Sequence, residues 1–397
     1  MTTTPLIPSH GASARRTVDL AYFNAGSGHR TSALALEAAI IRAGLPWNVR
    51  HVNVCEVIDP LGRFRRLTGM EPEDIYNKRL AHGWTLGMDK ELRLLQGMLR
   101  WSHKALVRKL EQHWSATQPD MVVSMVPNVN RALGESVARA LPGVPFATVL
   151  TDLADCPPHF WIEPGLNQHL VCGSPRAVAQ AQAAGCRSDH VHQSSGMLLG
   201  QGFYDRPQIC RATERLRVGL APRRPTGLVL FGGNGARTML GIAKRLPDTQ
   251  LILACGRNAA LARALRALPS RAPRLVLEYT SDMGHYMQLA DFFIGKPGSG
   301  SVSEAVHMHL PPITVRNRWT MPQERYSAEW VRENGVGLVL PSFKHIASAV
   351  DEVVQNLERF QNATRSHANR AAFEVPMILD SILAQSQARM APHQRRA

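Results

Sequence analysis

The chain has 397 residues, 44% of them apolar, which is enough for two domains with full hydrophobic cores. Its 46 Lys and Arg against 31 Asp and Glu give a formal charge of +15, which favours a polyanionic partner: nucleic acid, an anionic membrane face or phosphorylated ligands. No run of about 18 apolar residues is present, and the polar residues 1–16 lack the apolar core of a secretory signal, so neither a membrane-spanning helix nor such a signal is expected.

The six cysteines contain no C-x-x-C pair, and several stand in apolar surroundings. This usage predicts reduced, buried thiols in a cytosolic protein.

Short apolar segments rich in β-branched residues alternate with helical segments along the whole chain. In the first half we predict strands at 17–24, 48–54, 120–125, 145–151 and 168–172. In the second half we predict strands at 227–231, 250–254, 274–277, 291–294 and 312–315. This alternation predicts parallel βαβ units, and the two sets predict an α/β protein with two doubly wound domains.

The domain boundary is expected near 196–225, a stretch rich in glycine and proline that suits an exposed connection. The predicted division is a flexible N-terminus at 1–16, an N-terminal domain at 17–200, a linker at 201–226, a C-terminal domain at 227–355, and C-terminal helices with a frayed tail at 356–397. Ligands of such sheets bind at the carboxyl ends of the strands, so the loops after the strands carry the functional residues.

The first of these loops is NAGSGHR at 24–30, followed by a helix predicted at 30–43. Gly26 and Gly28 permit a tight turn on either side of Ser27, and His29 stands at the start of the helix, whose free N–H groups point at the cleft. The alternative is a structural glycine turn with an incidental histidine, because a lone Gly-x-Gly is a weak signal.

Residues 91–110 predict one amphipathic helix with leucines on one stripe and basic residues nearly opposite. The basic residues are Arg93, Arg100, Lys104 and Arg108. Between 61 and 110 there are eleven Lys and Arg against five acids, beside Trp84, Met88, Met98 and Trp101, which we expect to be exposed. The region is therefore expected to contact an anionic bilayer, with a leucine face packed on the core as the alternative.

The loop FGGNGAR at 231–237 has glycines at 232, 233 and 235 around Asn234, before a helix. This is a potential anion-binding turn. It lacks the Lys-Ser/Thr ending of a Walker loop and the G-x-G-x-x-G spacing of a dinucleotide-binding motif.

The loop GKPGSGSVSE at 295–304 follows a predicted strand and opens a helix. Gly298 and Gly300 permit close approach of a ligand on either side of Ser299. Glu304, expected near the first helical turn, can accept hydrogen bonds from two vicinal hydroxyls, as on a ribose. The alternative is a carboxylate that only caps the helix. After the last predicted strand, Gln323 and Glu324 place an amide beside a carboxylate, which suits a polyhydroxylated ligand.

The order of these loops resembles a GT-B glycosyltransferase, specifically the family 28-like group that contains plant-type monogalactosyldiacylglycerol synthases and bacterial processive diacylglycerol glucosyltransferases. The lipid II-forming enzyme of peptidoglycan synthesis is a more distant member. The motifs are GSGHR, TVLTDLADCPPHFWIEPG (148–165), LFGGNG, CGRN (255–258), KPGSGSVSEA and PQE, in the family's order over residues 18–340.

The resemblance implies two Rossmann-like domains facing across a cleft, with a UDP-sugar held by the C-terminal domain. Glu304 would bind the ribose, Gly233–Gly235 and Ser299–Gly300 would approach the diphosphate, and Gln323 and Glu324 would bind sugar hydroxyls. The loops that match the family's nucleotide-sugar motifs also include Gly232, Gly256 and Arg257.

It further implies transfer of a hexose, from UDP-galactose or UDP-glucose, to a lipid such as diacylglycerol with inversion. No cofactor and no tightly bound metal are expected. The acceptor would enter near Gly26, Ser27 and Gly28. The protein would lie in the cytoplasm, at the inner face of the cell membrane.

Inverting transfer to a hydroxyl needs a proton acceptor in line with the attack. His29 is the first candidate, because an imidazole titrates near neutral pH and the helix N-terminus is expected to lower its pKa. Asp152 is the second candidate and Asp155 a third, with capping of the local loop as the structural alternative for Asp152.

Two other functions remain open from the sequence. A UDP-sugar 2-epimerase shares the two-domain architecture, although GSGHR fits it less well. A nucleic-acid-binding protein would use the positive charge, but no aromatic-interleaved RNA motif or compact basic recognition helix is evident, so we expect no nucleic-acid partner.

Overall fold

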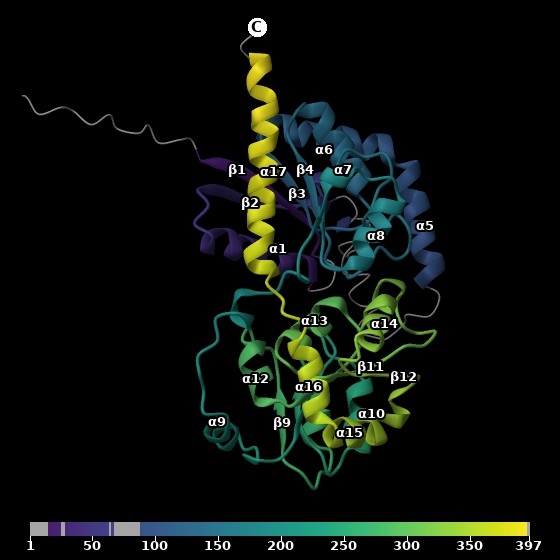
Figure 1. The fold of residues 1–397 in the computed structure, drawn as a ribbon. Coiled ribbons are helices and arrows are strands. Elements are labelled where there is room, and N and C mark those ends of the chain that lie inside the picture. The colour runs from purple at the N-terminus through teal and green to yellow at the C-terminus, as the bar shows by residue number, and fades with distance from the viewer. Residues whose placement is uncertain (1–14, 25–27, 63–64, 67–87, 395–397) are drawn as a thin grey trace, which may run out of the picture.

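The computed structural model describes residues 15–24, 28–62, 65–66 and 88–394, and it contains two parallel sheets (Figure 1). The first sheet has the strand order β2-β1-β3-β4-β5-β6. Its strands are β1 (Arg16–Tyr22), β2 (Trp47–Asn53), β3 (Met121–Ser124), β4 (Phe146–Val149), β5 (His169–Cys172) and β6 (Val191–Gln193).

The second sheet has the order β12-β11-β10-β7-β8-β9, and every pairing in both sheets is parallel. Its strands are β7 (Thr226–Leu230), β8 (Gln250–Ala254), β9 (Arg274–Leu277), β10 (Phe292–Gly295), β11 (Pro312–Val315) and β12 (Leu338–Leu340). In each sheet the order reverses at the strand that starts the unit, which is the doubly wound arrangement expected from the sequence.

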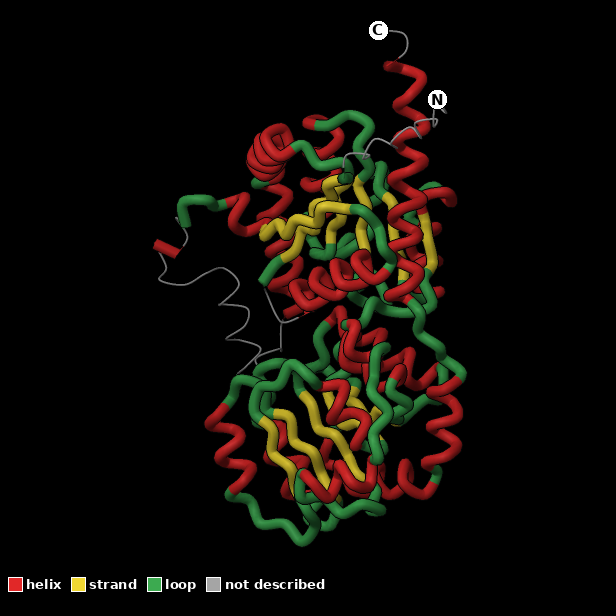
Figure 2. Tube along the Cα trace, turned by 90° about the vertical axis from the view of Figure 1, so that its left-hand side faces the viewer, coloured by secondary structure: helices red, strands yellow, loops and turns green. Residues whose placement is uncertain are grey.

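Helices cover both faces of each sheet (Figure 2). Those in the first half are α1 (Gly28–Arg42), α2 (Val54–Ile58), α5 (Met88–Trp101), α6 (His103–Thr117), α7 (Asn130–Ala140) and α8 (Pro175–Ala183), with 3₁₀ turns at Ser188–His190 and Gln201–Phe203. Those in the second half are α9 (Arg211–Arg217), α10 (Thr238–Arg245), α11 (Ala259–Arg266), α12 (Met283–Leu289), α13 (Ser299–His307), α14 (Arg325–Glu333), α15 (Ile346–Gln355), α16 (Leu357–Arg365) and α17 (Ala371–Gln394), with 3₁₀ turns at Pro322–Glu324 and Phe343–His345. No described helix has the length and apolar character needed to cross a bilayer.

Each sheet is buried because its strands are apolar on both faces, as parallel sheets require. In the first unit, α1 and α17 pack on one face, and α6 and α7 on the other. In the second unit, α10, α11 and α15 cover one face, whereas α12 and α13 cover the other.

The last helix, α17, returns to the first unit and packs along α1 (Figure 1). The chain therefore passes between the units twice, and the two passages are hydrogen-bonded. Asn369 donates a hydrogen bond of 2.8 Å to the Met197 carbonyl, and the Arg370 backbone N–H donates one of 2.7 Å to Ser195 Oγ. These bonds tie the crossing segments into one junction.

The segment 201–226, expected to be a linker, contains helix α9, which is fastened to the second unit. Arg215 is buried, and its guanidinium lies 2.6 Å from a carboxylate oxygen of Asp291. Arg211 lies 2.7 Å from the other oxygen of the same carboxylate. This part of the segment is thus anchored by a buried ion-pair network.

The predicted strands agree with the observed ones to within a few residues, but the sequence interpretation omitted β6 and β12. Each has three residues and lies at the edge of its sheet. A three-residue strand is too short to show a hydrophobic period, which explains the omission.

Candidate active site

Loops that follow strands of both sheets meet between the two units. Asp152 follows β4 in the first unit, and Ser299 is the first residue of α13, which follows β10 in the second. Ser299 Oγ donates a hydrogen bond of 2.9 Å to Asp152 Oδ1. Because ligands of parallel α/β sheets bind at the carboxyl ends of strands, this contact marks the candidate active site.

Asp152 is only 9% exposed, and each of its carboxylate oxygens accepts a hydrogen bond. The indole N–H of Trp161 donates to Oδ2 at 3.0 Å, while Ser299 occupies Oδ1. Burial raises the pKa of Asp152 to about 6, while the bonds from Trp161 and Ser299 favour the ionised form. The charges of Glu324 and Lys296 act in opposite directions, Glu324 raising the pKa and Lys296 lowering it. Asp152 is therefore mainly ionised at pH 7 and titrates close to it.

His29 and Asp152 share neighbouring residues, although no direct contact joins them among the described residues. It is the second residue of α1, its Nδ1 lies 3.3 Å from the hydroxyl of Thr151, and its ring centroid lies 6.0 Å from that of Trp161. Burial lowers the pKa of His29 to about 4, against an opposing backbone hydrogen bond at Met125. The expected direction of the shift is therefore right, but its main cause is burial rather than the helix N-terminus. The imidazole is neutral at pH 7.

Asp155, the third candidate base, is occupied in building the loop. Its two carboxylate oxygens accept the backbone N–H groups of Trp161 at 2.6 Å and His159 at 3.1 Å. Burial raises its pKa, and these bonds oppose the rise. Asp155 thus holds the segment that presents Trp161 to Asp152.

The sequence interpretation missed Lys296. This residue follows β10, and its ammonium forms an ion pair with Glu324, which is 6% exposed. A Cβ at Gly298 would lie 3.5 Å from Glu324 Oε1, and a Cβ at Gly232 would lie 3.9 Å from Lys296 Cε. Lys296 therefore lies between the glycine loop after β7 and the carboxylate after β11. A lysine inside a glycine-rich turn was the available signal.

The two glycine loops of the second unit pack against each other. The backbone N–H of Arg257 donates to the Gly233 carbonyl at 2.9 Å, and the Asn258 amide donates to the Asn234 carbonyl at 3.3 Å. Gly256 has φ +58°, and a Cβ there would lie 2.0 Å from the Gly233 carbonyl oxygen. The turns that include Gly232, with φ +73°, and Gly235, with φ +58°, are likewise left-handed.

Replacing Gly256 by alanine is expected to separate these loops, because the added methyl overlaps the Gly233 carbonyl. We expect a lower Tm, a stability loss of at least about 1–2 kcal/mol, and weaker UDP binding. The matched control is Gly219→Ala. Gly219 has φ +79° but no atom within 4 Å of the new Cβ, so its backbone strain is similar without a clash. Calorimetry with UDP, alongside thermal unfolding, separates the two variants; equal UDP affinity in both would contradict this role for the loop.

Glu304 lies in the second turn of α13, further along than the first turn expected. It is half-buried, burial raises its pKa to about 7, and its carboxylate has no hydrogen-bond or ion-pair partner among the described residues. The cap of α13 is Gly298, so the alternative in which Glu304 caps the helix does not apply. A desolvated carboxylate with unused acceptor positions is suited to ligand hydroxyls.

The remaining predicted site residues are Gly300, Gln323, Gly28, Gly26 and Ser27. Gly300 is exposed with open space at its Cβ position, and Gln323 is half-buried with its amide 3.8 Å from Met321 Sδ. Gly28 begins α1 and is likewise open to solvent. Gly26 and Ser27 lie outside the described residues.

The single helix expected at 91–110 is wrong. The structure has α5 and α6, separated at Ser102, whose hydroxyl and backbone N–H both donate to the Met98 carbonyl at 2.9 Å. Most of the leucine stripe packs on the core, at Leu92, Leu99, Leu106 and Leu110, whereas Leu95 is 44% exposed. All four predicted basic residues are exposed: Arg93, Arg100, Lys104 and Arg108.

The exposed surface of α5 is both apolar and basic. Leu94 is 65%, Met98 59% and Trp101 92% exposed. Trp84 lies outside the described residues, as does the side chain of Met88.

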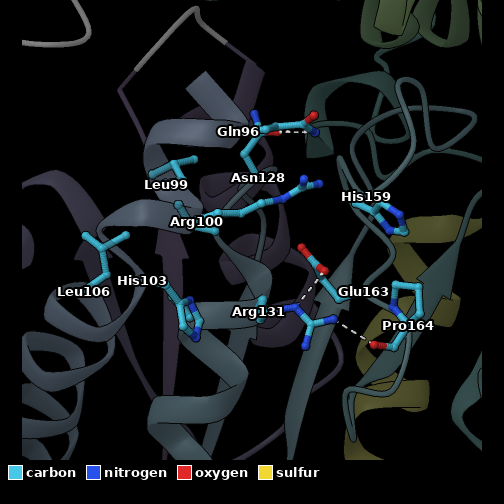
Figure 3. Close-up of a pocket in the computed structure, with 12 residues that line it drawn as sticks. Gln96, Leu99, Arg100, His103, Leu106, Asn128, Arg131, His159, Glu163 and Pro164 are labelled. Atoms are coloured by element: carbon cyan, nitrogen blue, oxygen red, sulfur yellow. Dashed lines mark hydrogen bonds and ion pairs between the residues drawn. The ribbon is translucent and has the colours of Figure 1, made fainter. Parts of the chain in front are cut away.

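Beside this surface lies a cavity of about 410 Å³ between α5, α6, α7 and the loop after β4. Figure 3 shows Arg100 reaching across the cavity toward His159. Arg131, which also lines the cavity, lies 3.2 Å from Glu163. Arg100 forms no ion pair within the described ranges. The cavity thus has an excess of cationic side chains under an apolar helix.

Comparisons with known proteins show which proteins the chain resembles. The glycosyltransferase family 28 C-terminal domain matches residues 228–381. The probable monogalactosyldiacylglycerol synthase 3 of Oryza sativa subsp. japonica is 28% identical over 367 residues, covering 86% of this chain and 68% of that protein. Monogalactosyldiacylglycerol synthase 1 of Arabidopsis thaliana is 27% identical over 396 residues, covering 93% and 72%.

Solved structures share the whole fold at low sequence identity. MurG of Acinetobacter baumannii has a TM-score of 0.58 at 13% identity, covering 92% of this chain and 99% of its own. The UDP-GlcNAc 2-epimerase of Neisseria meningitidis has a TM-score of 0.56 at 12% identity, covering 93% and 100%. Together, the domain match, the relatives and the fold show that the chain is similar to family 28 glycosyltransferases of the GT-B fold.

Proposed function

We propose that the chain transfers a hexose from a UDP-sugar, UDP-galactose or UDP-glucose, to a lipid acceptor such as diacylglycerol, with inversion at the anomeric carbon. The observation that carries the proposal is the contact of Asp152 with Ser299, which brings a proton-accepting group of the first unit to the glycine loops of the second. The names of the relatives, which are monogalactosyldiacylglycerol synthases, support galactose and diacylglycerol as the first substrates to test.

The donor would lie on the second unit. Glu304 would accept the ribose hydroxyls, and the backbone of the loops at 232–235 and 256–257 would approach the diphosphate. The Lys296 ammonium, next to Gly232, would oppose the charge that develops on the departing UDP, together with the N-terminus of α13. Glu324, paired with Lys296, and Gln323 would bind sugar hydroxyls.

The acceptor hydroxyl would approach from the first unit near His29. There the neutral imidazole takes the proton as the oxygen attacks, and the ionised Asp152 stabilises the positive charge that develops at the anomeric carbon. In the alternative assignment, Asp152 itself takes the proton. Both groups contact Trp161, which supports a common reaction centre.

The test is release of UDP from a panel of UDP-sugars with total membrane lipid as acceptor, followed by mass spectrometry of the lipid product. A glycolipid formed with stoichiometric UDP supports the proposal. The fold alone does not separate this function from a UDP-sugar 2-epimerase, which the same assay without lipid detects as an epimer rather than UDP.

We also propose that α5 and α6 bring the enzyme to the inner, anionic face of the cell membrane. Exposed Met98 and Trp101 lie beside exposed cations, and the cavity under α5 adds further cationic groups. An apolar and basic surface of this kind suits the boundary between acyl chains and anionic head groups.

Neutralising Arg93, Arg100, Lys104 and Arg108 together is expected to lower binding to anionic vesicles by at least about tenfold, and added salt should weaken wild-type binding similarly. The measurement is co-sedimentation with vesicles of phosphatidylglycerol and phosphatidylcholine. A control variant neutralises three arginines and one lysine that are exposed on the second unit: Arg223, Lys244, Arg245 and Arg263. Equal losses in both variants would show a response to net charge rather than to this surface. Gel shifts with random DNA test the nucleic-acid alternative.

A further inference from the structure

The Asp152 carboxylate receives one hydrogen bond from each unit. Trp161, which belongs to the same unit as Asp152, donates to Oδ2 at 3.0 Å. Ser299, from the other unit, donates to Oδ1 at 2.9 Å. The surroundings of Asp152 are therefore complete only when the two units are together.

A second hydroxyl stands behind the first. Ser327 Oγ, on α14, lies 2.9 Å from Ser299 Oγ. A hydroxyl has one proton to donate, so when Ser299 donates to Asp152, Ser327 must donate to Ser299. Ser299 is 4% exposed and Ser327 is 0% exposed, so bulk water does not compete for these positions. The two serines thus form a directed chain that ends on the carboxylate.

We propose that Ser299 is a positioning residue that keeps the Asp152 carboxylate ionised and oriented at the junction of the two units. The proposal rests on the proposed function only in that it places Asp152 in the reaction centre.

Burial at the contact between the units removes water from the Asp152 carboxylate, which favours its neutral form. The fixed hydroxyl donor from the second unit replaces that water and favours the ionised form. The other charged or titratable groups near Asp152 are Lys296 and Glu324 from the second unit, and His29 and Asp155 from the first. Lys296 and Glu324 are paired with each other, so their effects on Asp152 partly cancel.

Helix α13 links the ionisation of Asp152 to binding of the UDP-sugar. Helix α13 begins at Ser299 and carries Glu304 in its second turn. A nucleotide held by Glu304 would therefore fix the helix that supplies the hydrogen bond to Asp152. Binding of the UDP-sugar and ionisation of Asp152 would in this way be coupled through α13.

The test uses the Trp161 indole N–H as a reporter, because it donates directly to Asp152 and needs no enzyme activity to be observed. Its resonance in ¹⁵N spectra of the full chain, assigned with Trp161→Phe, is followed against pH, and Asp152→Asn should abolish the titration. In Ser299→Ala the midpoint should move upward by about one pH unit, since a donor to the charged form is lost. In Ser327→Ala the shift should be smaller. Ser348→Ala, an exposed serine of the same unit, should show none.

The activity profile gives a second readout. Turnover of Ser299→Ala should fall roughly fivefold at pH 6 and recover above about pH 8, whatever the effect on the KM for the UDP-sugar. An unmoved Trp161 midpoint, or a loss of turnover that is equal at all pH values, would overturn the positioning role. If the midpoint moves but no UDP-hexose is consumed with any lipid, the proposed function fails and the role of Ser299 stands.

Discussion

Replacing His29 by alanine is expected to lower turnover by about 10²–10⁴-fold, the usual contribution of a general base, while UDP binding barely changes. UDP binding should barely change because the nucleotide would lie on the other unit. Burial lowers the pKa of His29 to about 4, so the imidazole is unprotonated at pH 7 but is a weaker proton acceptor than an exposed histidine. The measurement is kcat against pH, with UDP affinity by calorimetry. His345→Ala, which changes an exposed histidine, is the control and should behave as wild type.

The pH profile separates the two candidate bases. A base must be unprotonated, so activity rises with pH through its pKa, which is about 4 for His29 and about 6 for Asp152. We expect wild-type turnover to rise near pH 6 as Asp152 ionises, and Asp152→Asn to lose that step but keep the one near pH 4. If His29→Gln retains most of its activity and Asp152→Asn loses it, Asp152 is the base and the primary assignment is wrong.

The parts of this site that local sequence predicts are the loops, because strand ends and glycine turns leave local patterns. Strands β7, β10 and β11 are apolar and short, and the glycine turns at Gly232 and Gly298 come within three residues of the ends of β7 and β10. A doubly wound order then places these loops at one edge of the sheet. The sequence therefore indicates which segments form the site without giving the contacts between them.

Contacts between the units leave no local signal. Asp152 and Ser299 are 147 positions apart, and their hydrogen bond depends on how two separately folded sheets dock. No local pattern indicates the ion pair between Lys296 and Glu324 either, since each residue alone resembles a solvated surface charge. The return of α17 to the first unit is a third case, because an apolar helix face does not specify which sheet it covers.

The leucine stripe shows a limit of periodicity. Leu95 and Leu106 fall on one side of an ideal helix, but Leu95 is 44% exposed whereas Leu106 is buried. A hydrophobic period predicts which residues share a side of a helix, but not how far along the helix that side is covered by the rest of the protein.

Replacing Glu304 by alanine is expected to weaken UDP binding by roughly 30–150-fold, the effect of losing about 2–3 kcal/mol from a carboxylate that accepts two hydroxyls. Folding should not suffer, because Glu304 has no partner among the described residues. Burial raises its pKa from 4.5 to about 7, so stability falls as pH rises from about 4.5 to about 7 and stays lower above that range. The variant should therefore have an equal or higher Tm at pH 8, together with weaker nucleotide binding.

The same carboxylate should release a proton when UDP binds. Ribose hydroxyls that donate to Glu304 favour its ionised form, so the pKa falls from about 7 and binding becomes tighter as pH rises. Calorimetry in buffers of different ionisation enthalpy measures this release. Glu304→Gln removes it and leaves only the proton linkage of the UDP phosphates, which is common to both proteins, while Glu358→Ala on exposed α16 should match wild type. Unchanged UDP affinity in Glu304→Ala, or equal proton release in Glu304→Gln, would show that the ribose binds elsewhere, because a desolvated carboxylate in contact with hydroxyls must respond to both changes.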